Sequence, residues 1–503
     1  MVENRPGTLA GHLQLSRDSQ RPAVKIDTLT LSYAELIDLV ESTGAQLRAM
    51  GVEPADRVVV MMPNCAEHIV AVLAANTAGA IAVPIDPEAG SCRLVDIVEQ
   101  TRPCLCVVGM DQATLADIQT VSLHIDPARK CAQFAHGATA AVVEQIDLPL
   151  DQIAFIRFTS GSTGHAKGVV LTHAQQLWIA RSLSEHFGFD TGHNELILVS
   201  MALSGGWQRV AATLYAGGCV IIANKPLSVG DLLDTLANTG ATGFFTPPPL
   251  LRMLLASPAD KVSDALRACK TIEIGSAAVT ADELQDFVSR VPDARVYVHY
   301  GLTECSRAVI LDTGRYPDRL TTVGRPAAGV DIRIVDHRGN ELACNQSGQI
   351  LLRGPQLTAG YWQQPDLNRQ RISNGWLATG DYGAIDEAGF LTLRGRHDDL
   401  INCGGHCYFP DEVEQALGSL HGIEQYLIAG VPDPRGMLQQ VPWAFVVPVD
   451  ADEWSPADYL LQARRALPAY MVPRRVLTVP CLPLTPSGKP DRREAVKLYA
   501  SSA

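Results

Sequence analysis

Short apolar runs recur along the chain, separated by helix-length segments that mix apolar and polar residues. This alternation is typical of α/β proteins with largely parallel sheets. The clearest strand candidates are residues 57–63, 81–85, 105–109, 151–159, 196–201, 271–276 and 295–300. The pattern therefore predicts an α/β fold with a large N-terminal body of packed α/β subdomains.

Residues 271–300 predict a strand, a helix and a second strand. Thr280 and Glu283 have the spacing of a capping box, in which two side chains satisfy backbone N–H groups at the start of a helix. In parallel sheets, ligands gather at the carboxyl ends of the strands. We therefore expect Gly275 and Ser276 to share one rim of a sheet with residues 300–304.

The pattern changes after residue 390. Residues 389–395 resemble a hairpin strand, and a burst of charge at 396–399 precedes a new apolar start at Leu400. Pro410 suits the first position of a helix, because the N–H that proline lacks would have no partner there. The last part of the chain therefore predicts a small α/β domain of its own.

Composition places the chain among globular proteins. It has 503 residues, of which 47% are hydrophobic and 19% charged, which excludes disorder for most of the chain. At roughly 150 residues per domain, this length suggests about two to four domains. The 41 basic and 54 acidic side chains give a net charge of −13, which argues against a nucleic acid polymer as partner and favours an enzyme with small-molecule substrates.

The cysteines and the apolar runs indicate a protein of the reduced cytoplasm. The 12 cysteines are scattered, and the close group of Cys403, His406 and Cys407 has no second pair at zinc-site spacing. The N-terminus lacks the apolar core of a secretory signal. The most apolar run, residues 69–85, contains Pro84 and is shorter than the roughly 20 residues of a membrane-spanning helix, so we expect no membrane span.

Residues 158–168 carry the strongest local signal for ligand chemistry. Their sequence is Phe-Thr-Ser-Gly-Ser-Thr-Gly-His-Ala-Lys-Gly, in which glycines let the backbone turn tightly and hydroxyls and amides can donate to phosphate oxygens. Lys167 adds a positive charge. The segment is not a Walker P-loop, because Gly168 rather than Ser or Thr follows the lysine. It therefore predicts a phosphate-binding loop of another kind.

This loop resembles the phosphate-binding motif of the adenylate-forming superfamily, which includes acyl- and aryl-CoA synthetases, adenylation domains of peptide synthetases, and luciferases. Ala166 stands where the consensus has Pro. Further motifs of the family follow in the same order, with Tyr-Gly-Leu-Thr-Glu at 300–304, Thr-Gly-Asp at 379–381, Gly-Arg-His-Asp-Asp at 395–399 and Pro-Ser-Gly-Lys at 486–489. The resemblance covers essentially the whole chain.

The resemblance implies an enzyme that forms an acyl-AMP from ATP and a carboxylic acid, releases pyrophosphate, and passes the acyl group to an acceptor. Attack of the carboxylate on the α-phosphorus builds up negative charge, so positioning and cationic stabilisation must dominate catalysis. The residues implied for ATP are Thr159, Ser160, Gly161, Ser162, Thr163, Gly164 and Lys167 at the β- and γ-phosphates, Thr303 at the α-phosphate, Tyr300 with Gly275, Ser276 and Ala277 around adenine, Asp381 with Arg396 at the ribose, and Glu304 as the ligand of Mg2+.

The resemblance also implies an N-terminal ATP- and acid-binding domain, 1–397, and a small mobile C-terminal α/β domain, 398–503. Asp398 would be the hinge, and Lys489 would be the catalytic cation that bridges the carboxylate and the α-phosphate. After rotation, Gly404 and Gly405 would line the channel of the acceptor.

The acid is expected to lie against Leu203, Ser204, Trp207 and His299, although a buried core position for Trp207 is equally compatible with the sequence. Members of the family that activate amino acids place an Asp near here to pair with the α-ammonium, and residues 200–209 contain none. We therefore expect an aliphatic, cyclic or aryl carboxylic acid without a free α-amino group.

CoA is the expected acceptor, because the chain has the two-domain length and the Gly-Gly loop but no attached carrier domain. One alternative is a stand-alone ligase that delivers the acyl group to a carrier-protein thiol or to an amine. Another is a catalytically silent nucleotide-binding homologue, which the presence of Lys167, Glu304, Asp381 and Lys489 argues against.

Overall fold

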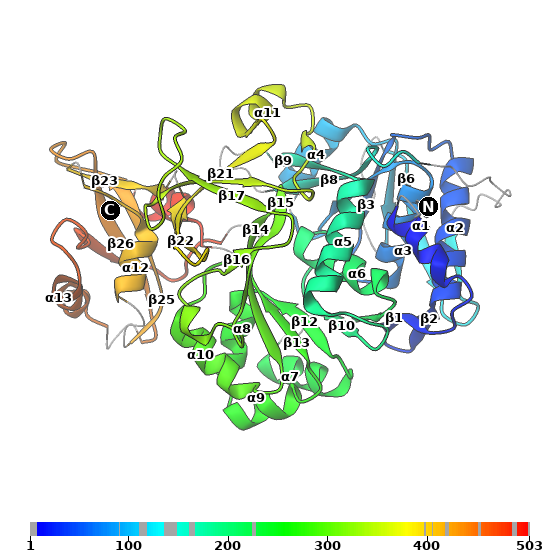
Figure 1. Ribbon diagram of the computed structural model, residues 1–503, viewed down its shortest axis with the longest axis horizontal. Coiled ribbons are helices and arrows are strands. Elements are labelled where there is room, and N and C mark those ends of the chain that lie inside the picture. The colour runs from blue at the N-terminus through cyan, green and yellow to red at the C-terminus, as the bar shows by residue number, and fades with distance from the viewer. Residues whose placement is uncertain are drawn as a thin grey trace. The chain divides into compact units, whose positions relative to one another are not determined.

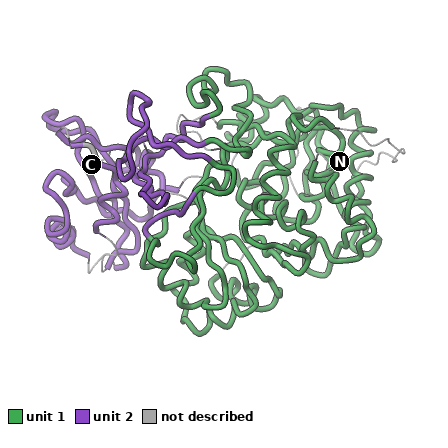
Figure 2. The backbone as a smooth tube through the Cα atoms, viewed as in Figure 1, with its two compact units in different colours: residues 1–320, 326–330, 353–375 green, residues 321–325, 331–352, 376–503 purple. Residues whose placement is uncertain are grey.

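The computed structural model describes residues 8–89, 91–109, 118–134, 148–159, 166–223, 228–396, 399–404, 406–417, 422–450, 454–484 and 490–500. The chain forms two compact units (Figure 2): unit 1 comprises residues 1–320, 326–330 and 353–375, and unit 2 comprises residues 321–325, 331–352 and 376–503. Each unit combines helices and strands, which confirms the predicted α/β class. The domain boundary expected at Asp398 lies outside the described residues and stays a prediction.

The first sheet of unit 1 is mainly parallel (Figure 1). Its order is β16-β15-β14-β13-β12-β10-β11-β1-β2, and every pair from β14 to β1 is parallel. The strands are β1 (Pro22–Ile26), β2 (Leu29–Ser32), β10 (Asn194–Ile197), β11 (Cys219–Ile222), β12 (Gly243–Thr246), β13 (Thr271–Ile274), β14 (Arg295–Leu302), β15 (Cys305–Asp312) and β16 (Arg325–Pro326). The carboxyl ends of β13 and β14 lie side by side, as predicted for the rim that carries Gly275, Ser276 and residues 300–304.

The second sheet of unit 1 has the order β19-β9-β8-β4-β3-β5-β6-β7. Its strands are β3 (Arg57–Met61), β4 (Ile81–Ile85), β5 (Leu105–Val108), β6 (Thr120–Asp126), β7 (Cys131–Phe134), β8 (Ile153–Thr159), β9 (Lys167–Thr172) and β19 (Gly360–Tyr361). β8 and β9 are antiparallel neighbours, so the chain enters and leaves the phosphate loop on adjacent strands.

Helices of unit 1 pack against these sheets, and α5 and α6 lie side by side (Figure 1). The capping box predicted at Thr280 is present and opens α10, and a second capping box at Thr172 opens α5. The α-helices described in this unit are α1 (Leu9–Leu13), α2 (Tyr33–Ala49), α3 (Ala66–Thr77), α4 (Ser91–Thr101), α5 (His173–Phe187), α6 (Ser204–Tyr215), α7 (Val229–Asn238), α8 (Pro248–Leu255), α9 (Ala259–Ala265), α10 (Ala281–Arg290) and α11 (Pro365–Arg371). The unit also contains the short strand β20 (Ile372–Ser373) and the 3-10 turns η1 (Gln14–Ser16) and η2 (Pro317–Arg319).

Unit 2 contains the strand sequence β17-β18-β21 with β22 beside β21, a two-stranded hairpin of β23 and β24, and a sheet of β25, β26 and β27. Pro410 is the first residue of α12, as predicted. The elements are β17 (Asp331–Val335), β18 (Gly348–Arg353), β21 (Trp376–Ile385), β22 (Leu391–Arg396), β23 (Ile401–Cys403), β24 (His406–Tyr408), α12 (Pro410–Leu417), β25 (Ile423–Pro432), β26 (Gln440–Pro448), α13 (Pro456–Ala466), β27 (Arg475–Thr478), α14 (Arg492–Ala495) and η4 (Val496–Ala500).

Two of the sequence expectations concern the chain as a whole. Among the described residues, no helix combines the length and the apolar character that crossing a bilayer requires. The cysteines whose side chains are described are free thiols.

Candidate active site

The base of the phosphate loop is fixed by the pairing of β8 with β9. Thr159, the last residue of β8, lies opposite Lys167, the first residue of β9. A Cβ added to Gly168 would lie 2.9 Å from Ile156 Cγ2, so this position has room only for glycine. The structure thus brings Thr159 and Lys167 together, whereas Ser160, Gly161, Ser162, Thr163 and Gly164 lie outside the described residues.

Ala166 ties the loop base to helix α4. Its N–H donates to Asp96 Oδ2 at 2.9 Å, and its carbonyl accepts from Gln100 Nε2 at 3.0 Å. Arg93, on the same helix, donates to the carbonyl of Phe158 at 3.0 Å. Proline has no N–H, so the consensus proline of the adenylate-forming superfamily could not make the bond to Asp96. The departure from the consensus therefore adds a hydrogen bond at the loop base.

Thr303 and Glu304 form the turn between β14 and β15. The flanking residues Leu302 and Cys305 are directly paired, which leaves Thr303 and Glu304 as the two connecting residues. A Cβ on Gly301 would lie 2.4 Å from the backbone nitrogen of Arg307, so the hairpin closes tightly only with glycine there.

Glu304 is anchored to the strand that leaves the phosphate loop. Tyr361 donates its hydroxyl to Glu304 Oε1 at 2.9 Å, and the backbone of Tyr361 pairs with Val169 in β9. The next residue, Trp362, donates its backbone N–H to the carbonyl of Gly168 at 2.7 Å. Glu304 and the base of the phosphate loop at Lys167, which are 137 positions apart on the chain, are thereby brought together. Tyr361 is not among the residues predicted from the sequence, because its short strand carries no spacing signal.

The residues expected around adenine lie at the ends of β13 and β14. Gly275 follows β13, and its backbone N–H donates to Thr246 O at 3.4 Å. Ser276 has φ +81°, in the left-handed region that non-glycine residues rarely adopt. Tyr300, near the end of the adjacent β14, is 8% exposed. The loop of Gly275, Ser276 and Ala277 therefore shares a rim with Tyr300, as predicted.

His299 lies directly against Gly275. A Cβ added to Gly275 would lie 2.2 Å from His299 Cε1, so the ring occupies the space that a side chain would need. The ring of Phe245 lies 5.6 Å from that of His299, and the edge of Phe245 would meet a Cβ on Gly205 at 3.1 Å. His299, Phe245 and the first turn of α6 are therefore neighbours.

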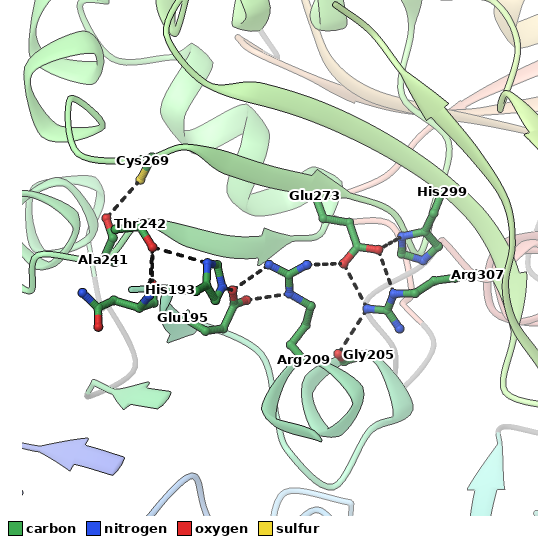
Figure 3. A network of polar contacts seen from close by, with 11 residues as sticks. His193, Glu195, Gly205, Arg209, Ala241, Thr242, Cys269, Glu273, His299 and Arg307 are labelled. Carbon is green, nitrogen blue, oxygen red and sulfur yellow. Dashed lines mark hydrogen bonds and ion pairs between the residues drawn. The ribbon is translucent and has the colours of Figure 1, made fainter. Parts of the chain in front are cut away.

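Behind this surface lies a network of buried charges that the sequence analysis did not identify (Figure 3). Glu273 is fully buried and contacts His299, Arg307 and Arg209. Burial by itself raises the pKa of the Glu273 carboxyl, but Arg307, His299 and Arg209 outweigh burial and hold that pKa well below its ordinary value. Glu273 is therefore a carboxylate, and it connects β14 and α6, which carry predicted site residues, with β15.

The network continues away from the rim. Arg209 donates to both oxygens of Glu195 at 2.6 Å, and His193 Nε2 lies 2.8 Å from Glu195 Oε2. Burial raises the pKa of Glu195, but Arg209 and His193 outweigh it, so this pKa is lowered overall. Glu273 is a charged residue inside the apolar strand β13, and this was the sequence signal that could have indicated the network. The partners of Glu273 cannot be identified from the sequence.

The start of α6 presents two of the residues expected at the acid. Leu203 is 37% exposed and Ser204 is half-buried at the first turn. Trp207 has 0% exposure, and its ring packs 5.6 Å from that of Phe155 inside the main core. Of the two positions that the sequence allows for Trp207, the acid pocket and the buried core, the structure has the core position. The Trp207 side chain packs between α6 and the main core.

Unit 2 contains the pair expected at the ribose. Asp381 on β21 lies directly opposite Arg396 on β22, with 3.5 Å between Arg396 Nε and Asp381 Oδ1. Thr379 Oγ1 donates to Ile350 O at 2.8 Å and accepts from the N–H of Asp381 at 3.0 Å, which orients this part of β21. Gly404 has φ +63° in the turn after β23. Asp398, Gly405 and Lys489 lie outside the described residues.

A magnesium ion fits the donor set at Glu304. Mg2+ prefers oxygen ligands and is commonly held by one or two carboxylates together with phosphate oxygens of a substrate. Glu304 offers a half-buried carboxylate of which one oxygen is held by Tyr361. Within the described ranges, no group of three or more His, Cys, Asp or Glu side chains could cage a metal by itself.

Comparisons with known proteins agree with this arrangement. Residues 12–362 match the family model described as AMP-binding enzyme, and residues 412–489 match the AMP-binding enzyme C-terminal domain. The chain is 30% identical over 473 residues to feruloyl-CoA synthase of an Amycolatopsis species, covering 93% of this chain and 94% of the relative. It is 28% identical over 520 residues to 2-succinylbenzoate–CoA ligase of Bacillus cereus, covering 99% of each. The crystal structure of ATP-bound MatB from Rhodopseudomonas palustris superposes with a TM-score of 0.87 at 25% identity, covering 98% of this chain and 100% of the other.

Proposed function

Because this chain belongs to the AMP-binding enzyme family and is an ATP-dependent, adenylate-forming acid ligase, we propose that it joins a carboxylic acid without a free α-amino group to the thiol of CoA. The observation that carries the assignment of the site is the link from Glu304 through Tyr361 to the base of the phosphate loop. It sets a carboxylate for Mg2+ beside a loop suited to phosphates. The two curated relatives named above are both CoA ligases, which supports CoA as the acceptor.

In the first half-reaction, the acid carboxylate attacks the α-phosphorus of ATP and pyrophosphate leaves. Lys167 and the loop from Thr159 onward bind the β- and γ-phosphates, with Ser160, Gly161, Ser162, Thr163 and Gly164 as the donors between them. Thr303 contacts the α-phosphate, and Glu304 would hold Mg2+. The ion would supply positive charge that offsets the negative charge of the phosphate groups.

The adenine and the ribose of ATP are bound by different parts of the chain. Tyr300 stacks on adenine beside Gly275, and Asp381 accepts hydrogen bonds from the ribose hydroxyls, a role that suits a carboxylate because its oxygens accept from a diol. Arg396 orients Asp381 across the 3.5 Å that separates them.

The C-terminal part supplies Lys489, which bridges the reacting carboxylate and the α-phosphate. In the second half-reaction the CoA sulfur attacks the acyl carbon, AMP leaves, and the thiol proton is released. We place the hinge for the change between half-reactions at Asp398, so that residues 398–503 move relative to 1–397 and Gly404 with Gly405 line the thiol channel. One site can then exclude water during two different reactions.

Pyrophosphate release across a panel of carboxylic acids tests the first half-reaction. We expect release with at least one acid, and loss of about 100-fold or more in Lys489→Ala, because removal of a transition-state cation costs several kcal/mol. The matched control is Lys497→Ala, an exposed lysine in the same terminal segment, which should leave the rate unchanged. Wild-type rates in Lys489→Ala would contradict the assignment of the lysine.

Acceptor addition tests the second half-reaction. CoA, a carrier protein bearing its thiol arm, and a set of amines are added separately to the enzyme that has formed acyl-AMP, and products are identified by mass. A thioester with CoA is the expected product. If an amide or a carrier-bound acyl group forms and acyl-CoA does not, the acceptor is an amine or a carrier protein rather than CoA. If no acid causes pyrophosphate release, a catalytically silent homologue becomes the favoured interpretation.

A further inference from the structure

The carboxylate of Glu273 holds the ring of His299 in one orientation (Figure 3). His299 Nδ1 lies 2.7 Å from Glu273 Oε1, and Glu273 has 0% exposure while the His299 side chain is 10% exposed. Arg307 Nε also lies 2.7 Å from Glu273 Oε1, and Arg209 Nη1 lies 3.4 Å from Glu273 Oε2. The carboxylate is thereby fixed from three sides, and the imidazole cannot turn without losing its partner.

This contact selects one tautomer of His299. A ring nitrogen so close to a carboxylate oxygen must carry the proton, because two lone pairs would repel each other. Burial, which is the largest influence, lowers the pKa of His299, and the arginines Arg307 and Arg209 act in the same direction against the attraction of Glu273. The ring is therefore neutral at pH 7, with hydrogen on Nδ1 and a lone pair on Nε2.

The ring of His299 borders the region proposed for the acid. Nδ1 is buried, so the 10% of the His299 side chain that is exposed belongs to the rest of the side chain. The ring lies over Gly275 at the end of β13 and beside Phe245, whose edge approaches Gly205 in the first turn of α6. Nε2 is thus a hydrogen-bond acceptor between the adenine loop and the start of α6.

The arginines of the network cannot serve a second carboxylate. A guanidinium has five N–H donors. In Arg307 they go to both oxygens of Glu273, to Gln208 Oε1, to Ser306 Oγ at 3.3 Å and to the carbonyl of Gly205 at 3.4 Å. Arg209 donates to both oxygens of Glu195 and to Glu273, and its side chain has 0% exposure. Neither Arg307 nor Arg209 is therefore available to a second carboxylate.

We propose that His299 Nε2 accepts a hydrogen bond from a hydroxyl group of the acid substrate, and that Glu273 is the positioning residue that keeps this nitrogen unprotonated. The substrate class is a hydroxylated acid with a single carboxylate. The inference rests on the proposed acid-activating function and narrows it.

The test uses matched acids that differ in one group. Benzoate, cinnamate, 3-phenylpropionate and cyclohexanecarboxylate scaffolds are each assayed for pyrophosphate release as the hydroxylated, the unsubstituted and the dicarboxylate member. On the best scaffold we expect kcat/KM for the hydroxylated acid to exceed that of the unsubstituted acid by about 10-fold or more, with the dicarboxylate lowest.

Variants at His299 then assign the preference. His299→Phe, which keeps a ring but has no acceptor, should bring the ratio between hydroxylated and unsubstituted acid to about 3-fold or less. His299→Gln, whose amide oxygen can reach a similar position, should retain part of the ratio. His12→Phe is the matched control, because His12 is a half-buried histidine stacked on Tyr215 at 4.0 Å, and it should keep the wild-type ratio.

The role of Glu273 needs a readout other than stability. Glu273→Gln removes the charge that selects the tautomer, and it should lower the ratio between hydroxylated and unsubstituted acid as well as the melting temperature. Selective 15N-histidine NMR of the wild-type enzyme, with the His299→Phe spectrum for assignment, should show Nδ1 protonated and Nε2 unprotonated, and this measurement does not require a folded Glu273 variant.

The outcomes separate this inference from the proposed function. A wild-type ratio near one, a ratio that survives in His299→Phe, or a protonated Nε2 would overturn the inference while pyrophosphate release continued. Absence of pyrophosphate release with every acid would instead overturn the acid-activating function on which the inference rests.

Discussion

Tyr361 donates its hydroxyl hydrogen to Glu304 Oε1 across 2.9 Å, and its backbone pairs with Val169 in the strand that leaves the phosphate loop. One tyrosine thus connects the proposed metal ligand to the proposed phosphate site. The hydrogen bond fixes one carboxylate oxygen and orients the other, so it sets the geometry of the proposed metal site.

Tyr361→Phe should therefore weaken magnesium binding in the ATP complex. Hydrogen bonds to charged groups contribute about 1.5–3 kcal/mol, so ATP–pyrophosphate exchange should fall about 10-fold at limiting Mg2+ and recover in part when Mg2+ is raised. Tyr297→Phe is a matched control, because Tyr297 is buried and its hydroxyl has no hydrogen-bond partner among the described residues. Equal exchange rates and equal Mg2+ dependence in the two variants would contradict the role of Tyr361.

Ala166→Pro should loosen the base of the phosphate loop, because it removes the N–H that donates to Asp96 Oδ2. A net loss of about 1 kcal/mol is expected for one hydrogen bond, which corresponds to about a 5-fold rise in the KM for ATP. Asp96→Ala should have a similar effect alone and a much smaller one in the Ala166→Pro background. Full additivity of the two changes in this double-mutant cycle would show that the bond does not contribute.

Gly275→Ala should disrupt the acid site, because the added Cβ would lie 2.2 Å from His299 Cε1. Forcing extra volume into a packed site costs about 1–3 kcal/mol, so pyrophosphate release should fall about 10-fold or more. The double variant Gly275→Ala/His299→Ala removes the collision and should recover activity with an unsubstituted acid relative to Gly275→Ala. No recovery would mean that the glycine is needed for a reason other than the ring of His299.

The stability of the enzyme should fall in mild acid because of His68. Burial lowers the pKa of His68 to about 4, and Arg157 acts in the same direction. Since the unfolded chain binds this proton below about pH 6.5 and the folded chain only near pH 4, the contribution is complete above pH 6.5 and is lost as the pH falls from 6.5 to 4. The loss amounts to about 3 kcal/mol for this one side chain.

His68→Asn removes the titrating ring and keeps a donor for the carbonyl of Met62, which lies 3.2 Å from His68 Nδ1. The difference in free energy of unfolding between wild type and variant, measured by denaturant at several pH values, should change by about 3 kcal/mol between pH 7 and pH 4. His337→Asn, at an exposed loop position, should show no such change. A difference that is independent of pH would contradict the assignment to His68.

Local signals predicted much of the fold and the outline of the site. The capping box at Thr280 depends only on two residues three positions apart, and it is present. The shared rim of Gly275 and Tyr300 followed from the rule that ligands gather at the carboxyl ends of parallel strands, and β13 and β14 are parallel neighbours.

Long-range pairings were beyond the reach of these signals. Asp96 meets Ala166 across 70 positions, and Arg209 meets Glu273 across 64. With 41 basic and 54 acidic side chains in the chain, the sequence alone does not select which charges pair inside the core. The burial of Trp207 was undecided for a related reason, because it depends on Phe155 from another strand.

The closed set of contacts around Arg307 also constrains how this protein can change over evolutionary time. Because each of its donors already has an acceptor, a single substitution at Glu273 or Arg307 leaves a charge stranded in the core, which typically costs about 3–5 kcal/mol. Mutational paths to a new acid are therefore expected to run through residues such as Leu203, which is 37% exposed, while Glu273, Arg307 and Arg209 are inherited together.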